Sequence, residues 1–231
     1  MAEPQAELWP ASMDDEEAPA FFLPADAIRE FIGSPKKPDE YPVFVKYLFE
    51  EFVSPPHDDK LWDLLAHLER ETDFYTAPAS TRFHGAQPCG LIRHSLLVLA
   101  NGIKLVPVML DDGVDTYFLA VSCLFHDLCK VNMYEQKLRN VKNEKTGEWE
   151  KEPFYSVKQD YIAYGHGIES LLRIAKFIEL PESWKHAVRW HMGAYDISPM
   201  DKIAMDKVLA KYKEVLFLQT ADMQAGLVEA I

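Results

Sequence analysis

The sequence has too few basic residues, too few cysteines and hydrophobic runs too short for several classes of protein. It carries 24 Lys and Arg against 37 Asp and Glu, for a net charge of −13, whereas proteins that bind long nucleic acids usually present a basic surface. No run reaches the roughly 18 apolar residues of a membrane-spanning helix, and the first residues lack the features of a signal peptide. Three cysteines without a C-x-x-C pair are typical of reduced cytosolic thiols. We therefore expect a cytoplasmic protein with no membrane span and no long nucleic-acid partner.

What the sequence does contain is enough apolar material for one sizeable core, at 48% hydrophobic residues. The charge is unevenly distributed, because residues 1–40 hold a net −7 and six of the 15 prolines. This composition predicts an extended, acidic, Pro-rich N-terminal arm over residues 1–40. Residues 41–231 show no linker and no repeat, and we predict that they form a single domain.

Apolar residues recur at helical spacing through most of this domain. Leu61, Leu65 and Leu68, for example, share one face of a predicted helix. A second helix is expected to end before Pro107, and Pro181 suits the first turn of another. We predict helices over residues 61–70, 91–105, 115–129, 167–179, 181–191 and 202–227, the last with room for a break. The fold class is therefore expected to be all-α.

Residues 133–157 differ from the rest of the domain, since they are rich in charge and contain the turn-forming segment 143–148 (NEKTGE). Strand-like stretches flank this segment on both sides, which predicts a β-hairpin inserted into the helical body. Such an insertion can serve as the lid or wall of a site, and a plain surface excursion is the alternative.

Four histidines and two aspartates occupy positions that should face the interior. A single histidine on an apolar helix face is usually a hydrogen-bonded core residue. The carboxylates of Asp127 and Asp222 are harder to explain in this way, because a buried carboxylate costs several kcal/mol unless it is neutralised, paired or bound to metal. Imidazole and carboxylate groups converging from different helices suit Fe, Mn, Zn or Ni. The candidate ligands are His94, His126, Asp127, His166, His191 and Asp222.

The order of these residues resembles the HD-domain superfamily of metal-dependent phosphohydrolases. His94, the adjacent pair His126-Asp127 and Asp222 match its H…HD…D pattern, and FHDLCK at residues 125–130 is similar to its H-D-x-x-K signature. The resemblance covers about residues 60–228. It implies an HD-type helical bundle.

The segments around the other two histidines fit the additional histidines of binuclear superfamily members. These segments are Gly165-His166-Gly167 and Trp190-His191-Met192-Gly193. Residues 77–91 are similar to the entry segment of bacterial HD-domain 3′–5′ exoribonucleases. No G-Y-P block follows the H-D-x-x-K signature, and only the acidic arm precedes the helices. A cyclic-dinucleotide phosphodiesterase and an enzyme acting on long RNA are therefore not expected.

The resemblance implies a role for each candidate residue. The first metal would be bound by His94, His126, Asp127 and Asp222. Asp127 would bridge to a second metal held by His166 and His191, the ions being divalent Fe, Mn, Ni or Mg. The resemblance also implies a catalytic role for Asp127 and Lys130. His84 and Arg93 would contact the substrate.

Two of these assignments have ordinary alternatives. Lys130 is equally interpretable as a cation at the C-terminal end of a helix. For Arg93, a flexible surface position is the more usual situation.

Three functions are compatible with this ligand set. The first is hydrolysis of a phosphoester in a nucleotide or another small phosphorylated substrate. The second is a di-iron oxygenase of the same superfamily, and the third is a non-catalytic binding protein built on the HD scaffold. Hydrolysis is preferred, because most members of the superfamily are hydrolases.

Overall fold

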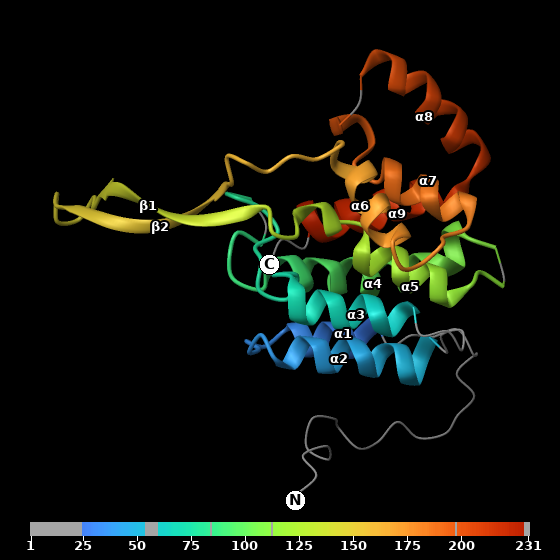
Figure 1. Cartoon of the computed structure of the whole chain (residues 1–231), viewed down its shortest axis with the longest axis horizontal. Helices are drawn as coiled ribbons and strands as arrows, with labels where there is room; N and C mark the ends of the chain where they lie inside the picture. The colour runs from blue at the N-terminus through green and yellow to red at the C-terminus, as the bar shows by residue number, and fades with distance from the viewer. Residues whose placement is uncertain (1–24, 54–59, 84, 112, 197, 229–231) are drawn as a thin grey trace, which may run out of the picture.

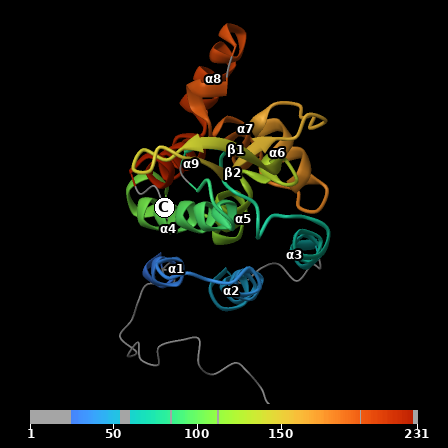
Figure 2. The ribbon, with the colours of Figure 1, turned by 90° about the vertical axis from the view of Figure 1, so that its left-hand side faces the viewer.

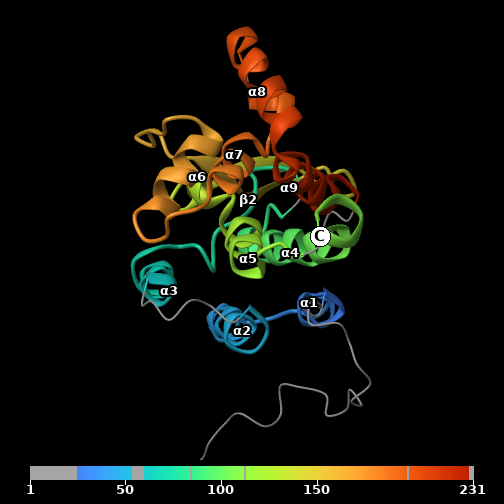
Figure 3. The ribbon, with the colours of Figure 1, turned by 90° about the vertical axis from the view of Figure 1, so that its right-hand side faces the viewer.

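The computed structural model describes residues 25–53, 60–83, 85–111, 113–196 and 198–228. These residues form a mostly helical fold with one two-stranded antiparallel hairpin, which confirms the all-α class with an inserted hairpin. The helices are arranged in three layers, with α4 and α5 in the middle (Figures 1, 2 and 3).

The first layer consists of N-terminal helices: α1 (Ala25–Ile32), α2 (Glu40–Leu48) with a π-helical extension (Phe49–Val53), and α3 (Lys60–Glu71). The extended arm predicted over residues 1–40 is therefore wrong for Ala25–Ile32. This segment is helical because Ala25, Ile28 and Ile32 fall on one face, which is buried against α4. Residues 1–24 of the predicted arm lie outside the described residues.

The middle layer is centred on α4 (Gly90–Met109), which contacts α1, α5 and α9. Contrary to the prediction, α4 does not end before Pro107. Pro107 lies exposed in the last turn, so the one hydrogen bond that it cannot donate is lost at the end of the helix and no further turns depend on it. Among the described residues α4 is the one helix long and apolar enough to cross a membrane, but 72% of that stretch is buried, as in the core helix of a globular protein.

The second helix of the middle layer is α5 (Thr116–Phe125), which begins at an Asp115 side chain that accepts a hydrogen bond from the amide of Tyr117. It ends four residues earlier than predicted. Asp127 leaves the helical conformation, at φ −106° and ψ 21°, and a short 3₁₀ turn, η2 (Leu128–Lys130), follows.

The third layer covers the face of α4 and α5 opposite α1–α3 (Figures 2 and 3). It contains α6 (His166–Ala175), α7 (Glu182–Trp190) and α9 (Lys213–Met223), the last continued by a π-helical turn (Gln224–Val228). A 3₁₀ turn (Gly193–Asp196) and α8 (Pro199–Lys211) connect α7 to α9, and α8 projects from the body (Figure 1). The predicted helix over 202–227 is thus broken at Tyr212.

The predicted hairpin is confirmed as β1 (Tyr134–Lys142) paired with β2 (Trp149–Val157), in a register running from Tyr134↔Val157 to Lys142↔Trp149. Its turn is held by the Asn143 side chain, which accepts hydrogen bonds from the amides of Lys145 and Thr146, and by Gly147 at φ +76°. The hairpin extends away from the helices, and only its base adjoins the body (Figure 1).

Candidate metal centre

Asp127 lies at the centre of the cluster of candidate ligands, immediately after α5. Its side chain is buried, and its two oxygen atoms face different groups of partners. Because the helix ends here, Asp127 and His126 can both point to the same centre, although neighbouring residues on a helix diverge by about 100°.

The Oδ2 atom of Asp127 faces two histidines and a lysine. The Nε2 atoms of His94 and His126 lie 3.6 and 3.4 Å from it, and the Nζ atom of Lys130 lies 2.7 Å away. Asp222, from α9, completes this side, since its Oδ1 is 3.0 Å from His94 Nε2 and 3.6 Å from His126 Nε2. Helices α4, α5 and α9 therefore converge on one point.

The Oδ1 atom of Asp127 faces the other two predicted histidines. His166 Nε2 lies 2.7 Å from Oδ1, and His191 Nε2 lies 3.5 Å from it. The imidazole rings of His166 and His191 are 5.1 Å apart, centre to centre. All six predicted ligands are thus brought together around the Asp127 carboxylate. His191 lies between the two sides, since its ring is 4.8 Å from that of His126, centre to centre, and its ligand atom is also within 4.8 Å of those of His126 and Asp222.

Gly167 allows α6 to approach α7 closely enough for His166 and His191 to lie near each other. A Cβ atom at position 167 would lie 2.2 Å from the backbone oxygen of Arg189, a distance that real Cβ atoms do not reach. His166 precedes this glycine, and His191 follows Arg189 by two residues. The packing of two backbones at Gly167 therefore sets the separation of the two imidazoles.

Two of the histidines are held in the tautomer that suits metal binding. His126 Nδ1 is 2.9 Å from the carbonyl oxygen of Cys123, and His191 Nδ1 is 2.7 Å from that of Val188. A carbonyl only accepts hydrogen bonds, so Nδ1 carries the proton in both rings. Each Nε2 is buried, faces the centre and has no hydrogen-bond partner within the described part of the chain. Such groups fit a bound cation, which would satisfy both nitrogen atoms.

The electrostatics of the centre are those of a site that holds protons when metal is absent. Burial favours neutral imidazoles, but Asp127, together with Asp222 at His126, raises the pKa of His126 and of His166 to about 10. Burial lowers the pKa of His191. Burial tends to raise the pKa of the Asp127 and Asp222 carboxyl groups. The neighbouring imidazoles, and Lys130 beside Asp127, outweigh this effect and hold the pKa of each well below its usual range.

Of the two residues predicted to contact substrate, Arg93 does not join this cluster. Arg93 is close to Tyr41 of α2, where it opposes the increase that burial causes in the pKa of the Tyr41 hydroxyl. Arg93 thus lies towards the N-terminal layer, and a substrate contact is not supported by this position. His84 lies outside the described residues.

Sequence reasoning missed two residues near the centre. In the sequence Cys129 is one of three reduced thiols with no assigned role. In the structure it is buried, and its Sγ atom lies 3.3 Å from His166 Nδ1. Its position two residues after the HD pair was the available signal. Arg173, on α6, carried no signal, because its contacts with the η2 turn are made to backbone carbonyls.

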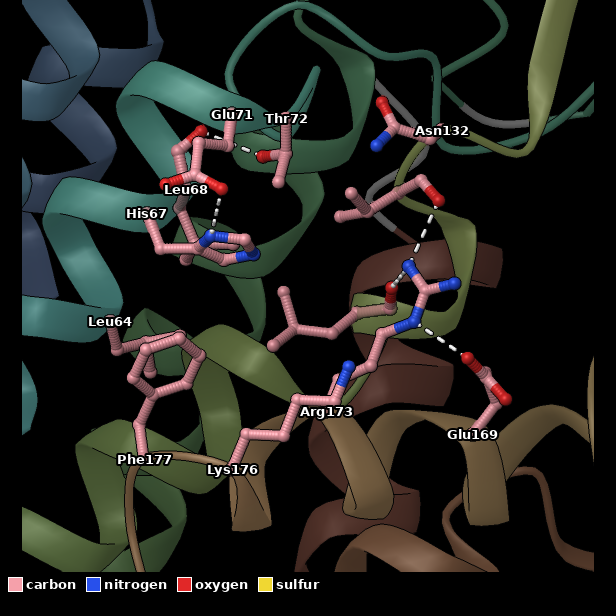
Figure 4. Close-up of a pocket in the computed structure, with 12 residues that line it drawn as sticks. Leu64, His67, Leu68, Glu71, Thr72, Asn132, Glu169, Arg173, Lys176 and Phe177 are labelled. Carbon is pink, nitrogen blue, oxygen red and sulfur yellow. Dashed lines mark hydrogen bonds and ion pairs between the residues drawn. The ribbon is translucent and has the colours of Figure 1, made fainter.

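Arg173 holds the turn that carries Asp127 and Lys130. Its Nη1 atom donates hydrogen bonds of 2.9 Å to the carbonyl oxygens of both Leu128 and Val131, and its Nε atom donates to Glu169 at 2.7 Å (Figure 4). The guanidinium group lines a pocket of about 230 Å³ between α3 and α6. One side chain therefore fixes both ends of the η2 turn.

Replacing Arg173 with methionine is expected to destabilise the protein and to weaken metal binding. The substitution leaves the Val131 carbonyl without the hydrogen bond that Arg173 donates, at about 1–3 kcal/mol. It also removes one of the two hydrogen bonds that the Leu128 carbonyl accepts, the other coming from the Val131 amide. Urea unfolding and the number of metal equivalents bound would measure the two effects. Lys176→Met, directly after the same helix and in the same pocket, is the matched control and should change neither quantity. Equal stability of the two variants would contradict the role assigned to Arg173.

Comparison of the chain with protein-family models, with curated proteins and with solved structures gave no match.

Proposed function

We propose that the protein is an HD-type metal-dependent phosphohydrolase that cleaves a phosphoester of a nucleotide or another small phosphorylated substrate. The observation that carries the proposal is the shared carboxylate of Asp127. Its Oδ2 faces His94 and His126, and its Oδ1 faces His166 and His191. A carboxylate placed between two groups of imidazoles is what a bridging ligand of two metal ions requires.

The donor set supports two divalent cations. His94, His126 and Asp222 would hold one ion, His166 and His191 the other, and Asp127 both. The Nε2 atoms of His126 and His191, which are buried and make no hydrogen bond in the described part of the chain, are consistent with this assignment. When bound, a pair of such ions supplies a hydroxide nucleophile at neutral pH and stabilises charge on phosphoryl oxygens.

Lys130 is the residue of this chain that we assign to the phosphoryl group. Burial opposes its charge, but the neighbouring Asp127 raises its pKa, so the ammonium group stays charged at neutral pH. Its side chain is 13% exposed, next to the deeply buried Asp127. A cation at this position can neutralise the charge that develops on a phosphate oxygen during hydrolysis.

The base of the hairpin provides a second candidate contact with the substrate. Burial, opposed by Lys130, raises the pKa of Tyr134 to about 12, so this hydroxyl group keeps its proton. Tyr134 is the first residue of β1 and lies close enough to Lys130 and Asp127 for their charges to affect it. This supports the interpretation of the hairpin as one wall of the site.

A screen for phosphate release would test the function. The purified protein, loaded with manganese, iron or nickel, would be offered a panel of nucleotides and small phosphoesters. Oxygen consumption by the iron-loaded protein would be followed in parallel, because the di-iron oxygenase has the same ligands. Release of phosphate without oxygen consumption is the expected result. Oxygen consumption with no phosphate release would contradict the proposal.

Lys130→Met is expected to lower kcat for phosphate release by about 10²–10³-fold, as removal of a stabilising group in a hydrolytic site does. The metal content should be unchanged, since Lys130 binds no metal. Lys137→Met, on the exposed part of β1, provides the control for loss of one positive charge. A fully active Lys130 variant would leave this residue as an ordinary cation at the end of a turn.

A further inference from the structure

Cys129 brings a thiol to one side of the candidate metal centre. Its side chain is 3% exposed, and its Sγ atom lies 3.3 Å from Nδ1 and 3.5 Å from Nε2 of His166. Potential ligand atoms of Asp127, Cys129 and His166 all lie within 4.8 Å of one another. The thiol is therefore as close to the histidine as a shared cation would require.

Two contacts hold the backbone of Cys129 in this position, and a third holds the residue before it. Its amide donates a 3.0 Å hydrogen bond to the Ser170 hydroxyl of α6, and its carbonyl oxygen accepts a hydrogen bond from the Tyr161 hydroxyl. Arg173 binds the carbonyl of the preceding residue, Leu128. The thiol is thus placed by the same turn that places Asp127, and little rearrangement is needed for both to bind one ion.

The neighbouring His191 supplies independent evidence that a ligand belongs on this side. Its side chain is buried, its Nδ1 is committed to the carbonyl of Val188, and its Nε2 has no hydrogen-bond partner in the described ranges. That Nε2 atom lies 3.5 Å from Asp127 Oδ1, the same oxygen that His166 approaches. A buried nitrogen atom that faces this carboxylate without making a hydrogen bond is expected where a cation binds.

We propose that Cys129 is a ligand of the metal ion on the Oδ1 side of Asp127, together with His166 and His191. On binding, a sulfur–metal bond forms and the thiol proton passes to solvent. The two metal positions then differ in chemistry. The Oδ2 side offers only nitrogen and oxygen donors, whereas the Oδ1 side includes a thiolate and favours a thiophilic ion such as zinc or cadmium over magnesium or manganese. This inference rests on the proposed metal centre.

Cobalt(II) titration of the full chain would test the proposal, since a cobalt–thiolate bond gives a sulfur-to-metal charge-transfer band in the near ultraviolet. We expect the band to develop in the wild-type protein and in Cys89→Ser, whose thiol is also buried. It should be absent from Cys129→Ser. Cys129→Ser should also weaken cadmium binding at this position by at least about 10–100-fold, since even the loss of a residue that only hydrogen-bonds to a ligand costs this much. The effect on manganese binding should be smaller.

The outcomes separate this inference from the proposed function. Cobalt binding by the wild-type protein without the charge-transfer band would overturn the role of Cys129 and leave the metal centre intact. No cobalt binding at all would overturn the metal centre, and the role of Cys129 with it. The wild-type spectrum decides between these outcomes even if Cys129→Ser fails to fold.

Discussion

Asp127→Asn is expected to remove metal binding and to abolish phosphate release. The amide has almost the same shape as the carboxylate, but it carries no charge and cannot bridge two cations. Loss of a single stabilising group lowers the rate of such a reaction by about 10²–10³-fold. The rate of phosphate release should fall by more than this in Asp127→Asn. Metal analysis of the purified variant and a phosphate assay would measure both effects.

The same substitution also removes the anion that compensates Lys130, whose Nζ lies 2.7 Å from Asp127. Breaking a buried ion pair on one side costs about 3–5 kcal/mol, so the fold of the variant must be verified by circular dichroism. Asp206→Asn, at an exposed position of α8, is the matched control. His191→Ala offers a milder test, because it should deplete mainly the ion on the Oδ1 side. Full metal content in the Asp127 variant would refute the bridging assignment.

The second large effect concerns stability and pH. As the pH rises from 6.5 to 10, the stability of the metal-free protein should fall, whereas the stabilisation that metal provides should increase. The pKa of His126 and of His166 is about 10 in the folded, metal-free protein and roughly 6.5 in the unfolded chain. Their charged forms therefore stabilise the folded state fully below pH 6.5, and this contribution is lost as the pH rises towards 10. Asp127 and Asp222, with lowered pKa values, stabilise above about pH 4 and lose this contribution in stronger acid.

Metal binding should stabilise the protein more strongly as the pH rises between 6.5 and 10. The reason is that a cation must displace protons from His126 and His166, which becomes easier at higher pH. The increase in melting temperature caused by metal should therefore grow with pH, each kcal/mol corresponding to about 2–4 °C for a chain of this size. A weakly buffered titration at pH 8 should release at least two protons for each protein molecule loaded. Thermal melts with and without chelator at several pH values would check the first expectation. Metal binding without proton release would show that the imidazoles are not the ligands.

The candidate site could be predicted from sequence because its chemistry conflicts with its surroundings. Asp127 and Asp222 occupy apolar helix faces, where an isolated carboxylate is costly. The histidines also fall on faces that should be buried, and a bound metal ion would compensate both kinds of group. The hairpin was predictable for a similar reason, since a charged segment with a turn sequence interrupts the apolar periodicity. Both signals are local, and both are read along a single element.

Other features depend on partners distant in the sequence. Ala25–Ile32 reads as part of an acidic, proline-rich arm, and only the apolar surface of α4 makes it a buried helix. Arg173 is an unremarkable helical arginine until α6 packs beside the η2 turn. Cys129 is one of three apolar-looking thiols until α6 places His166 beside it. Contacts of this kind are made between elements and leave no periodic trace.

The sequence alone determined the helical class, the hairpin and the identity of six candidate ligands, because these features follow from residue types and their spacing along the chain. The tertiary structure decided how these ligands are divided. It placed the two oxygen atoms of Asp127 towards different histidines, and it added a thiol on one side only. The division depends on where α5 ends and on how closely α6 and α7 pack at Gly167, which are properties of packed backbones rather than of any segment by itself.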